Sequence, residues 1–192
     1  MHPMTKFILH GGNIGIGPDE DRKRYFEEIV RGPKQPVRIL LIYFAKTTDQ
    51  WDAKLAEDRV FFSPEFVGCD CSVEVADPDP ETFSRQAARA DVLFVRGGDT
   101  LRLMEAIRPV TDFHRLLDGK TYAGSSAGAY LVSTYYYSND RKRVEEGLGI
   151  LPIKCFAHWD ASQRSATDEL TAYKESLPLV TLAEGAFKVF TE

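Results

Sequence analysis

A Gly-x-Ser-x-Gly sequence occupies residues 124–128 (GSSAG), directly between a predicted strand and a predicted helix. In this setting a sharp turn lifts the serine above the sheet edge, and the glycines leave room for close backbone approach. The serine also lies at a helix N-terminus, where free backbone N–H groups favour developing negative charge. The pattern therefore predicts a nucleophilic serine. The alternative is that Ser125 or Ser126 only caps the helix.

A diglycine turn, residues 97–100 (GGDT), follows another predicted strand. Attack on a carbonyl carbon creates a negative oxygen, which needs preorganised hydrogen-bond donors. The backbone N–H groups of Gly98 and Ala127 would supply them if the two turns face each other. The alternative is an ordinary tight turn in which Asp99 or Thr100 caps the next helix.

A serine hydroxyl becomes a good nucleophile only when a base takes its proton. Among the four histidines, His10 and His158 each close a predicted strand. His158 is favoured because it follows the serine turn in the chain. A carboxylate would then orient the imidazole: Asp140 gives the order Ser-Asp-His and Glu184 the order Ser-His-Glu. Both choices stay open on this reasoning.

Short apolar runs alternate with amphipathic stretches along the chain. Strands are predicted at residues 6–10, 37–44, 71–76, 92–95, 121–123, 151–157 and 179–182, and helices at 19–29, 51–60, from 79 onward, 101–107, 113–117, from about 127, and 167–176. This order predicts one α/β domain, residues 1–192, with a doubly wound, mainly parallel sheet and helices on both faces. Sites in such folds lie beyond the carboxyl ends of the strands, where the motifs above fall.

Composition sets limits on the partners. The chain has 192 residues, 43% hydrophobic and 28% charged, as in an ordinary globular protein. Its net charge of -5 argues against a nucleic-acid partner. No apolar run approaches the roughly 18 residues that a membrane span needs. The three cysteines, Cys69, Cys71 and Cys155, suit neither a zinc site nor a disulfide framework, so we expect reduced thiols in a cytoplasmic protein.

Four segments occur together in a familiar order: residues 97–100 (GGDT), 124–129 (GSSAGA), 147–152 (GLGILP) leading to His158, and 184–186 (EGA). As a set they resemble the peptidase E family of serine peptidases, which has the class I glutamine amidotransferase-like fold. The resemblance covers nearly the whole chain. It implies a hydrolase that removes an N-terminal aspartate from dipeptides without metal or cofactor. We expect a small peptide substrate and a monomer or homodimer.

Residue-by-residue matching to the family implies individual roles. Ser126 would be the nucleophile, His158 the base and Glu184 the third triad member, with Asp140 as the second choice for that place; Gly98 and Ala127 would form the oxyanion hole. The family usually has asparagine where this chain has Asp99. An extra carboxylate beside an oxyanion hole would oppose the developing negative charge unless it points away.

An aspartyl substrate brings a side-chain carboxylate, which calls for a fixed cation, preferably a bidentate arginine. Arg164 and Arg141 are the first candidates, and Arg143 and Arg96 are also available. Asp99 is included among the substrate-binding candidates because of its place beside the predicted oxyanion hole. The alternative for the basic cluster at residues 141–143 is a solvated loop.

Two other functions remain open beside the aspartyl dipeptidase. One is a related hydrolase acting on another acidic or β-aspartyl bond, as the cyanophycinases do. The other is a non-catalytic binding module that has kept the fold. A glutaminase subunit is disfavoured, because such enzymes use cysteine where this chain has Ser126.

Overall fold

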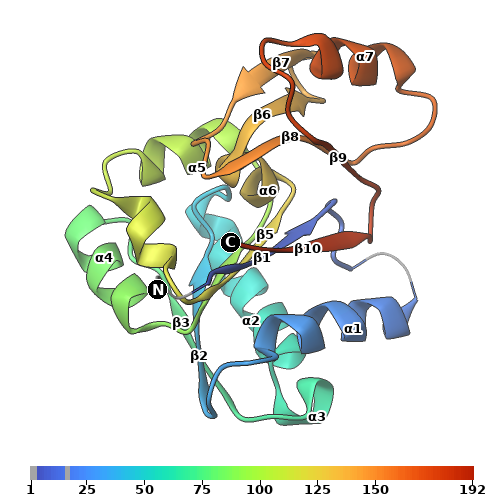
Figure 1. Ribbon diagram of the computed structural model, residues 1–192. Helices are drawn as coiled ribbons and strands as arrows, with labels where there is room; N and C mark the ends of the chain where they lie inside the picture. The colour runs from blue at the N-terminus through green and yellow to red at the C-terminus, as the bar shows by residue number, and fades with distance from the viewer. Residues whose placement is uncertain (1–3, 16–17) are drawn as a thin grey trace.

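The computed structural model describes residues 4–15 and 18–192, and Figure 1 shows their arrangement. The strands are β1 (Lys6–His10), β2 (Val37–Ile42), β3 (Cys71–Val75), β4 (Val92–Val95), β5 (Thr121–Ser125), β6 (Ser133–Ser138), β7 (Arg143–Glu146), β8 (Leu151–Ala157), β9 (Leu179–Leu182) and β10 (Phe187–Thr191). The helices are α1 (Asp19–Val30), α2 (Trp51–Phe61), α3 (Pro64–Val67), α4 (Pro80–Arg89), α5 (Thr100–Ile107), α6 (Ala127–Val132) and α7 (Arg164–Ala172), with short 3₁₀ helices η1 (Thr48–Gln50) and η2 (Phe113–Leu117).

The strands divide between two sheets. The larger sheet has the order β10-β1-β5-β4-β2-β3, and all of its neighbours are parallel except β10 beside β1. The smaller sheet has the order β7-β6-β8-β9 and is parallel except for β7. The α/β class and the mainly parallel pairing are therefore confirmed, although two sheets share the strands.

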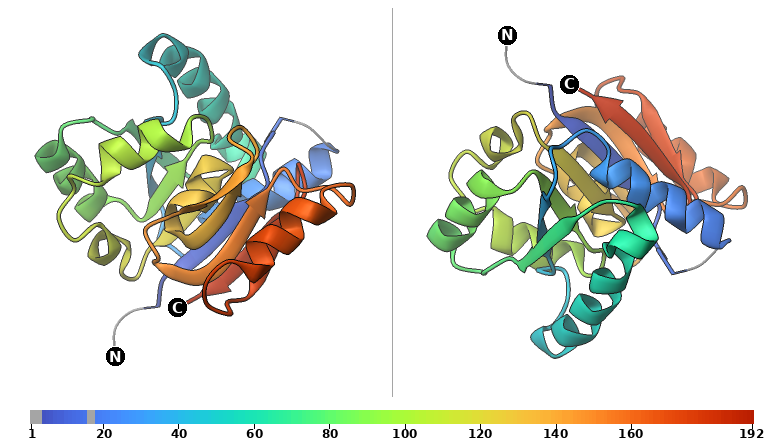
Figure 2. Two further views of the ribbon diagram at one scale, coloured as in Figure 1. Left: turned by 90° about the horizontal axis from the view of Figure 1, so that it is seen from above. Right: turned by 90° about the horizontal axis from the view of Figure 1, so that it is seen from below.

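Helices cover both faces of the larger sheet. Neighbouring strand residues point to opposite sides, so each face has its own apolar side chains to bury. Ile8 of β1 belongs to one buried cluster with Phe26 of α1. The next residue, Leu9, belongs to the other cluster, with Leu103 of α5. The two views in Figure 2 show the strands between these groups of helices. This arrangement confirms the predicted burial on both sides.

The smaller sheet carries α7 on its outer face, at the top of Figure 1. Tyr135 and Tyr137 of β6 pack with Leu170 of α7, whereas Tyr136 faces the main cluster and stacks on Tyr130 with ring centroids 4.4 Å apart. The same main cluster contains residues of both sheets. This shared core supports the prediction of a single domain.

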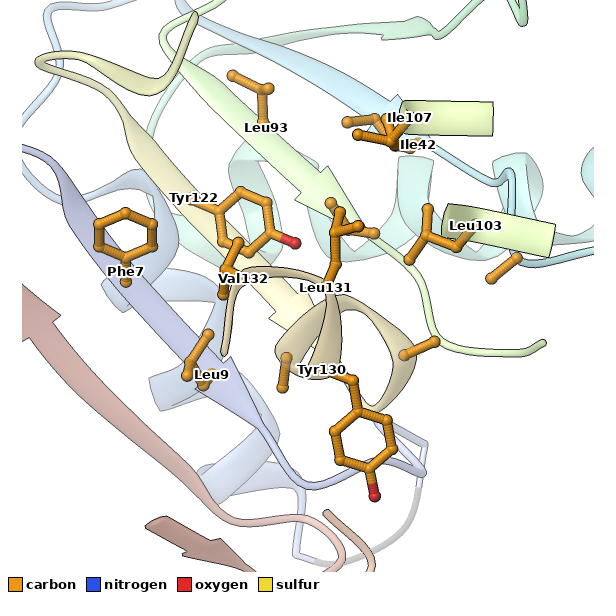
Figure 3. Close-up of a cluster of buried hydrophobic side chains, with 14 of the residues drawn as sticks. Phe7, Leu9, Ile42, Leu93, Leu103, Ile107, Tyr122, Tyr130, Leu131 and Val132 are labelled. Carbon is orange, nitrogen blue, oxygen red and sulfur yellow. The ribbon is translucent and has the colours of Figure 1, made fainter. Parts of the chain in front are cut away.

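Helix α6 is short, and its packing holds it in place. All six of its residues are buried. Figure 3 shows Leu131 and Val132 of this helix among side chains of the sheet and of α5, including Tyr122 and Leu103. A helix of this length is marginal on its own and depends on such contacts. The residue directly before it, Ser126, therefore follows a fixed strand and precedes a fixed helix.

Three global features bear on the predictions from composition. Among the described residues, no helix is long and apolar enough to cross a membrane. The three cysteines are free, with the Cys69 and Cys71 sulfur atoms 3.7 Å apart. Within residues 4–15 and 18–192, no group of three or more His, Cys, Asp or Glu side chains is arranged to hold a metal ion.

Candidate active site

Ser126 occupies a strained turn between β5 and α6, with φ of 51° and ψ of -105°. A positive φ is uncommon for a residue with a side chain, and such strain gathers at functional sites. The turn is tight: a Cβ atom on Gly124 would lie 2.6 Å from the carbonyl group of Gly128. Glycine is therefore required for the strand and the helix to meet this closely, as in a nucleophile elbow.

Ser126 contacts a histidine that in turn contacts a carboxylate. The Ser126 Oγ lies 2.8 Å from His158 Nε2, and His158 Nδ1 lies 3.0 Å from Glu184 Oε1. One tautomer satisfies both contacts, with Nδ1–H donating to the carboxylate and Nε2 accepting the serine proton. Hydrogen bonds from Asn13 and His158 hold the pKa of Glu184 below its usual value, which favours the ionised carboxylate.

The loop that follows β1 joins the three segments. Three consecutive backbone carbonyls, those of residues 10–12, accept hydrogen bonds at 2.9, 2.9 and 3.1 Å from the N–H groups of Ser126, His158 and Gly185. One short loop therefore sets the relative positions of the elbow, the histidine and the Glu184 turn.

The same loop places the imidazole from one side. Gly12 has a φ of 111°, and a Cβ atom there would lie 2.1 Å from Cε1 of His158. Any side chain at this position would displace the imidazole, so the glycine backbone forms a wall against the ring. The sequence places His10 at the end of a predicted strand but carries no sign of this role for Gly12.

The imidazole of His10, the other histidine at a strand end, makes no hydrogen bond to the Ser126 side chain among the described residues. It is buried, and its Nδ1 accepts a hydrogen bond from Gly12 N–H at 3.0 Å. Burial, together with the charges of Arg96 and His158, lowers the pKa of His10 to about 4. A neutral His10 thus stabilises the loop that positions the site.

The predicted oxyanion donors flank the elbow. The turn after β4 packs on it closely, since a Cβ atom on Gly97 would lie 3.0 Å from the Ser126 Cβ. Within the described part of the chain, neither Gly98 N–H nor Ala127 N–H donates a hydrogen bond to another protein group. Two backbone donors near Ser126 are thus available to an external oxygen.

A cavity of about 500 Å³ opens beside these groups. Ser126 and His158 line it, and three cations also reach it: Lys46, Lys54 and Arg96. A larger cavity, of about 690 Å³, lies near α5 and η2 and contains none of the groups in this site. Of these two cavities, the one beside Ser126 can hold a molecule against both the serine and the histidine.

The model of peptidase family S51 matches residues 7–191. The chain belongs to peptidase family S51. It is accordingly a serine peptidase, and the resemblance to the peptidase E family is confirmed.

Two solved structures share the fold. A peptidase from an acI-B1 actinobacterium has a TM-score of 0.67 and 19% identity, over 98% of this chain and 84% of that chain. A protein of Listeria monocytogenes EGD-e, named provisionally as a peptidase E, has a TM-score of 0.64 and 18% identity, over 98% of each chain. No curated protein sequence matches this S51 peptidase.

The two carboxylates considered for the third triad place lie differently in this S51 peptidase. Glu184 contacts the imidazole, as described above. Asp140 lines the cavity, but within residues 4–15 and 18–192 it makes no hydrogen bond or ion pair, with His158 or with any other side chain. The geometry therefore favours Glu184 next to the histidine and leaves Asp140 open to the cavity.

The residues predicted to bind substrate are not gathered in the cavity of this S51 peptidase. Arg141 donates to Glu145 at 2.9 Å, and Arg164 is an exposed residue at the start of α7. The Asp99 carboxylate accepts hydrogen bonds from two backbone N–H groups of α5, at 2.9 and 3.2 Å, which is the capping alternative. None of the three lines the cavity beside Ser126.

Arg96 is the only arginine of the predicted set among the described residues that reaches the cavity, and its charge is already compensated. Its Nε lies 3.1 Å from Asp58 Oδ1, and Asp58 is fully buried. The Arg96 side chain is therefore committed to an internal ion pair.

Proposed function

We propose that this S51 peptidase hydrolyses the peptide bond of small peptides that begin with aspartate, Asp-X dipeptides first. Ser126, His158 and Glu184 act as nucleophile, base and orienting carboxylate. The observation that carries the proposal is the continuous contact from Ser126 Oγ through both ring nitrogens of His158 to Glu184. Membership of family S51 supplies the reaction class.

In the acylation step the Ser126 Oγ attacks the carbonyl carbon of the peptide bond, and its proton passes to His158 Nε2. The carbonyl π electrons move to the oxygen, which becomes an oxyanion. The N–H groups of Gly98 and Ala127 donate to this oxygen. When the oxyanion collapses, the C–N bond breaks and His158 gives its proton to the leaving amine.

Deacylation repeats the same chemistry with water in place of the serine. Water loses a proton to His158 Nε2 and attacks the ester carbon. Collapse then breaks the bond to Ser126 Oγ, which takes the proton back from the histidine. Glu184 stabilises the imidazolium that forms in both halves of the reaction. No external oxidant, metal or cofactor enters this sequence of steps.

The cavity suits a short peptide with a free N-terminus. Its volume of about 500 Å³ lies in the range of small-molecule sites. The α-ammonium of a dipeptide needs an anionic partner, and Asp140 offers an uncommitted carboxylate in the cavity wall. We assign Asp140 to that ammonium rather than to the imidazole.

A panel of peptides tests the substrate class. We expect the kcat/KM for Asp-Leu to exceed that for Asn-Leu by at least about tenfold, because the site discriminates a charged group from its neutral isostere. The measurement is release of the C-terminal amino acid, leucine from these two peptides and arginine from the comparison substrate β-Asp-Arg. Hydrolysis of β-Asp-Arg alone would contradict the proposal and favour the β-aspartyl hydrolase, and hydrolysis of no peptide would favour the binding module.

Two isosteric variants separate the roles of the carboxylates. We expect Glu184→Gln to lower kcat by about 10²–10⁴, because an uncharged amide cannot stabilise the imidazolium or fix its tautomer. Asp140→Asn should mainly raise KM and change kcat by less than about fivefold, because it loses an ion pair with the ammonium. Steady-state kinetics on Asp-Leu distinguishes the two. A larger fall in kcat for Asp140→Asn than for Glu184→Gln would reverse the assignment.

A further inference from the structure

The cavity wall holds three cations, of which two are paired. Lys54 Nζ lies 2.7 Å from Glu57 Oε1, and Arg96 is paired with Asp58. Lys46 is different: in the described part of the chain its ammonium makes no hydrogen bond and no ion pair. Its side chain is half-buried all the same. One positive charge in the wall of the cavity thus lacks a partner.

The backbone places Lys46 next to the predicted oxyanion hole. The carbonyl of Ala45 accepts a hydrogen bond from Asp99 N–H at 2.9 Å, directly after Gly98. The N–H of Lys46 itself donates to the Tyr43 carbonyl at 2.7 Å. The main chain therefore fixes the position of Lys46. It directly follows Ala45, whose carbonyl contacts the turn after β4.

The surroundings of Lys46 disfavour its charge. Burial, followed by the charges of Lys54 and Arg96, lowers the pKa of Lys46 below its ordinary value. A half-buried ammonium beside two other cations loses hydration and is repelled by them. An anion that enters the cavity would offset both the lost hydration and the repulsion. The surroundings of Lys46 therefore favour the binding of an anion.

We propose that Lys46 binds a carboxylate of the substrate, an inference that rests on the proposed function of the Ser126 site. An Asp-X dipeptide carries two carboxylates, one on the aspartyl side chain and one at the C-terminus. Both present the same chemistry to Lys46. The experiment separates them with two amides, Asn-Leu for the side chain and the C-terminal amide of Asp-Leu for the terminus.

Binding is measured by calorimetry in the Ser126→Ala background, in which the peptides stay intact. The dissociation constants of Asp-Leu, Asn-Leu and Asp-Leu-amide are compared with and without Lys46→Met. We expect Lys46→Met to weaken Asp-Leu by about 10- to 100-fold, the size of a charge-assisted contact. Lys46→Met should also reduce the preference for Asp-Leu over one of the two amides to less than about twofold. The carboxylate that this amide lacks is then the one that Lys46 binds.

The control is Lys23→Met, which removes a lysine of α1 that pairs with Glu27 outside the cavity. It should leave all three dissociation constants unchanged. Unaltered preferences in Lys46→Met would overturn the role of Lys46 while leaving the proposed function intact. If none of the peptides binds, both proposals fail. If the peptides bind through Lys46 but the wild-type chain does not cleave them, only the proposed function fails.

Discussion

Replacing Ser126 with alanine should lower kcat for Asp-Leu by about 10⁴–10⁶, the range seen when the nucleophile of a serine peptidase is removed. The serine hydroxyl lies against the imidazole, with the Ser126 Oγ 2.8 Å from His158 Nε2, which is the contact that the proposed acyl transfer needs. The backbone turn does not depend on the hydroxyl oxygen, because the main-chain N–H of Ser126 donates to the His10 carbonyl. The free energy of unfolding should therefore change by less than about 1 kcal/mol.

The neighbouring serine gives the matched control for this experiment. Ser125 is buried at the end of β5 and, among the described residues, makes no hydrogen bond to His158. Ser125→Ala should retain kcat within about tenfold. Combining Ser126→Ala with His158→Gln should cost little more than Ser126→Ala alone, because the two residues act as one unit. Full activity in Ser126→Ala would exclude this residue as the nucleophile.

Replacing Asp58 with alanine should destabilise the fold by about 3–5 kcal/mol, the usual cost of leaving one buried charge without its partner. Asp58 is fully buried, and Arg96 is 7% exposed. The Asp58 carboxylate also accepts a hydrogen bond from the Tyr43 hydroxyl at 2.7 Å. Urea unfolding measures the loss through the shift in midpoint at constant slope.

Glu57→Ala is the control for the Asp58 variant. Glu57 contacts Arg96 at 3.4 Å but is 44% exposed, so its removal should cost less than about 1 kcal/mol. The double variant Asp58→Leu/Arg96→Met should recover much of the loss, because an apolar pair replaces the buried ions. A cost below about 1 kcal/mol for Asp58→Ala would show that the pair contributes little to the stability of the cavity wall.

The sequence predicts best those elements whose apolar runs end at glycine, proline or polar turns. The strands at residues 6–10, 92–95, 151–157 and 179–182 are confirmed with their bounds. Helix 113–117 forms as a 3₁₀ helix, and helix 167–176 is found at residues 164–172. Ends are harder to place than elements, because caps and tertiary contacts compete there.

Three strands were not predicted. β10 lies at the edge of the larger sheet and β7 at the edge of the smaller one. Neither contains a buried residue, so neither has the apolar pattern of a buried strand. β6 follows α6 without any turn residue to separate them. Tyr135 and Tyr137 of β6 belong to one buried cluster and Tyr136 to another, because successive residues of a strand point to opposite faces.

In the candidate site, too, some residues can be predicted from the sequence pattern, whereas others depend on packing in the folded chain. Ser126, His158 and Glu184 each follow a strand, so the rule on strand ends led to all three. The loop at residues 10–12 acts through backbone carbonyls, which leave no signature in residue types. The sequence carries no sign of the role proposed for Lys46, because that role depends on which cations find partners, and this is decided only in the folded chain.

The nucleophile can be tested directly by reaction of the folded protein with a fluorophosphonate probe. The tryptic peptide spanning residues 121–141 contains both Ser125 and Ser126, so fragment ions must locate the label within it. The predicted result is a label on Ser126 in the native chain and none in Ser126→Ala. A label on Ser125, or no label on folded protein, would contradict the assignment of Ser126 as the catalytic serine.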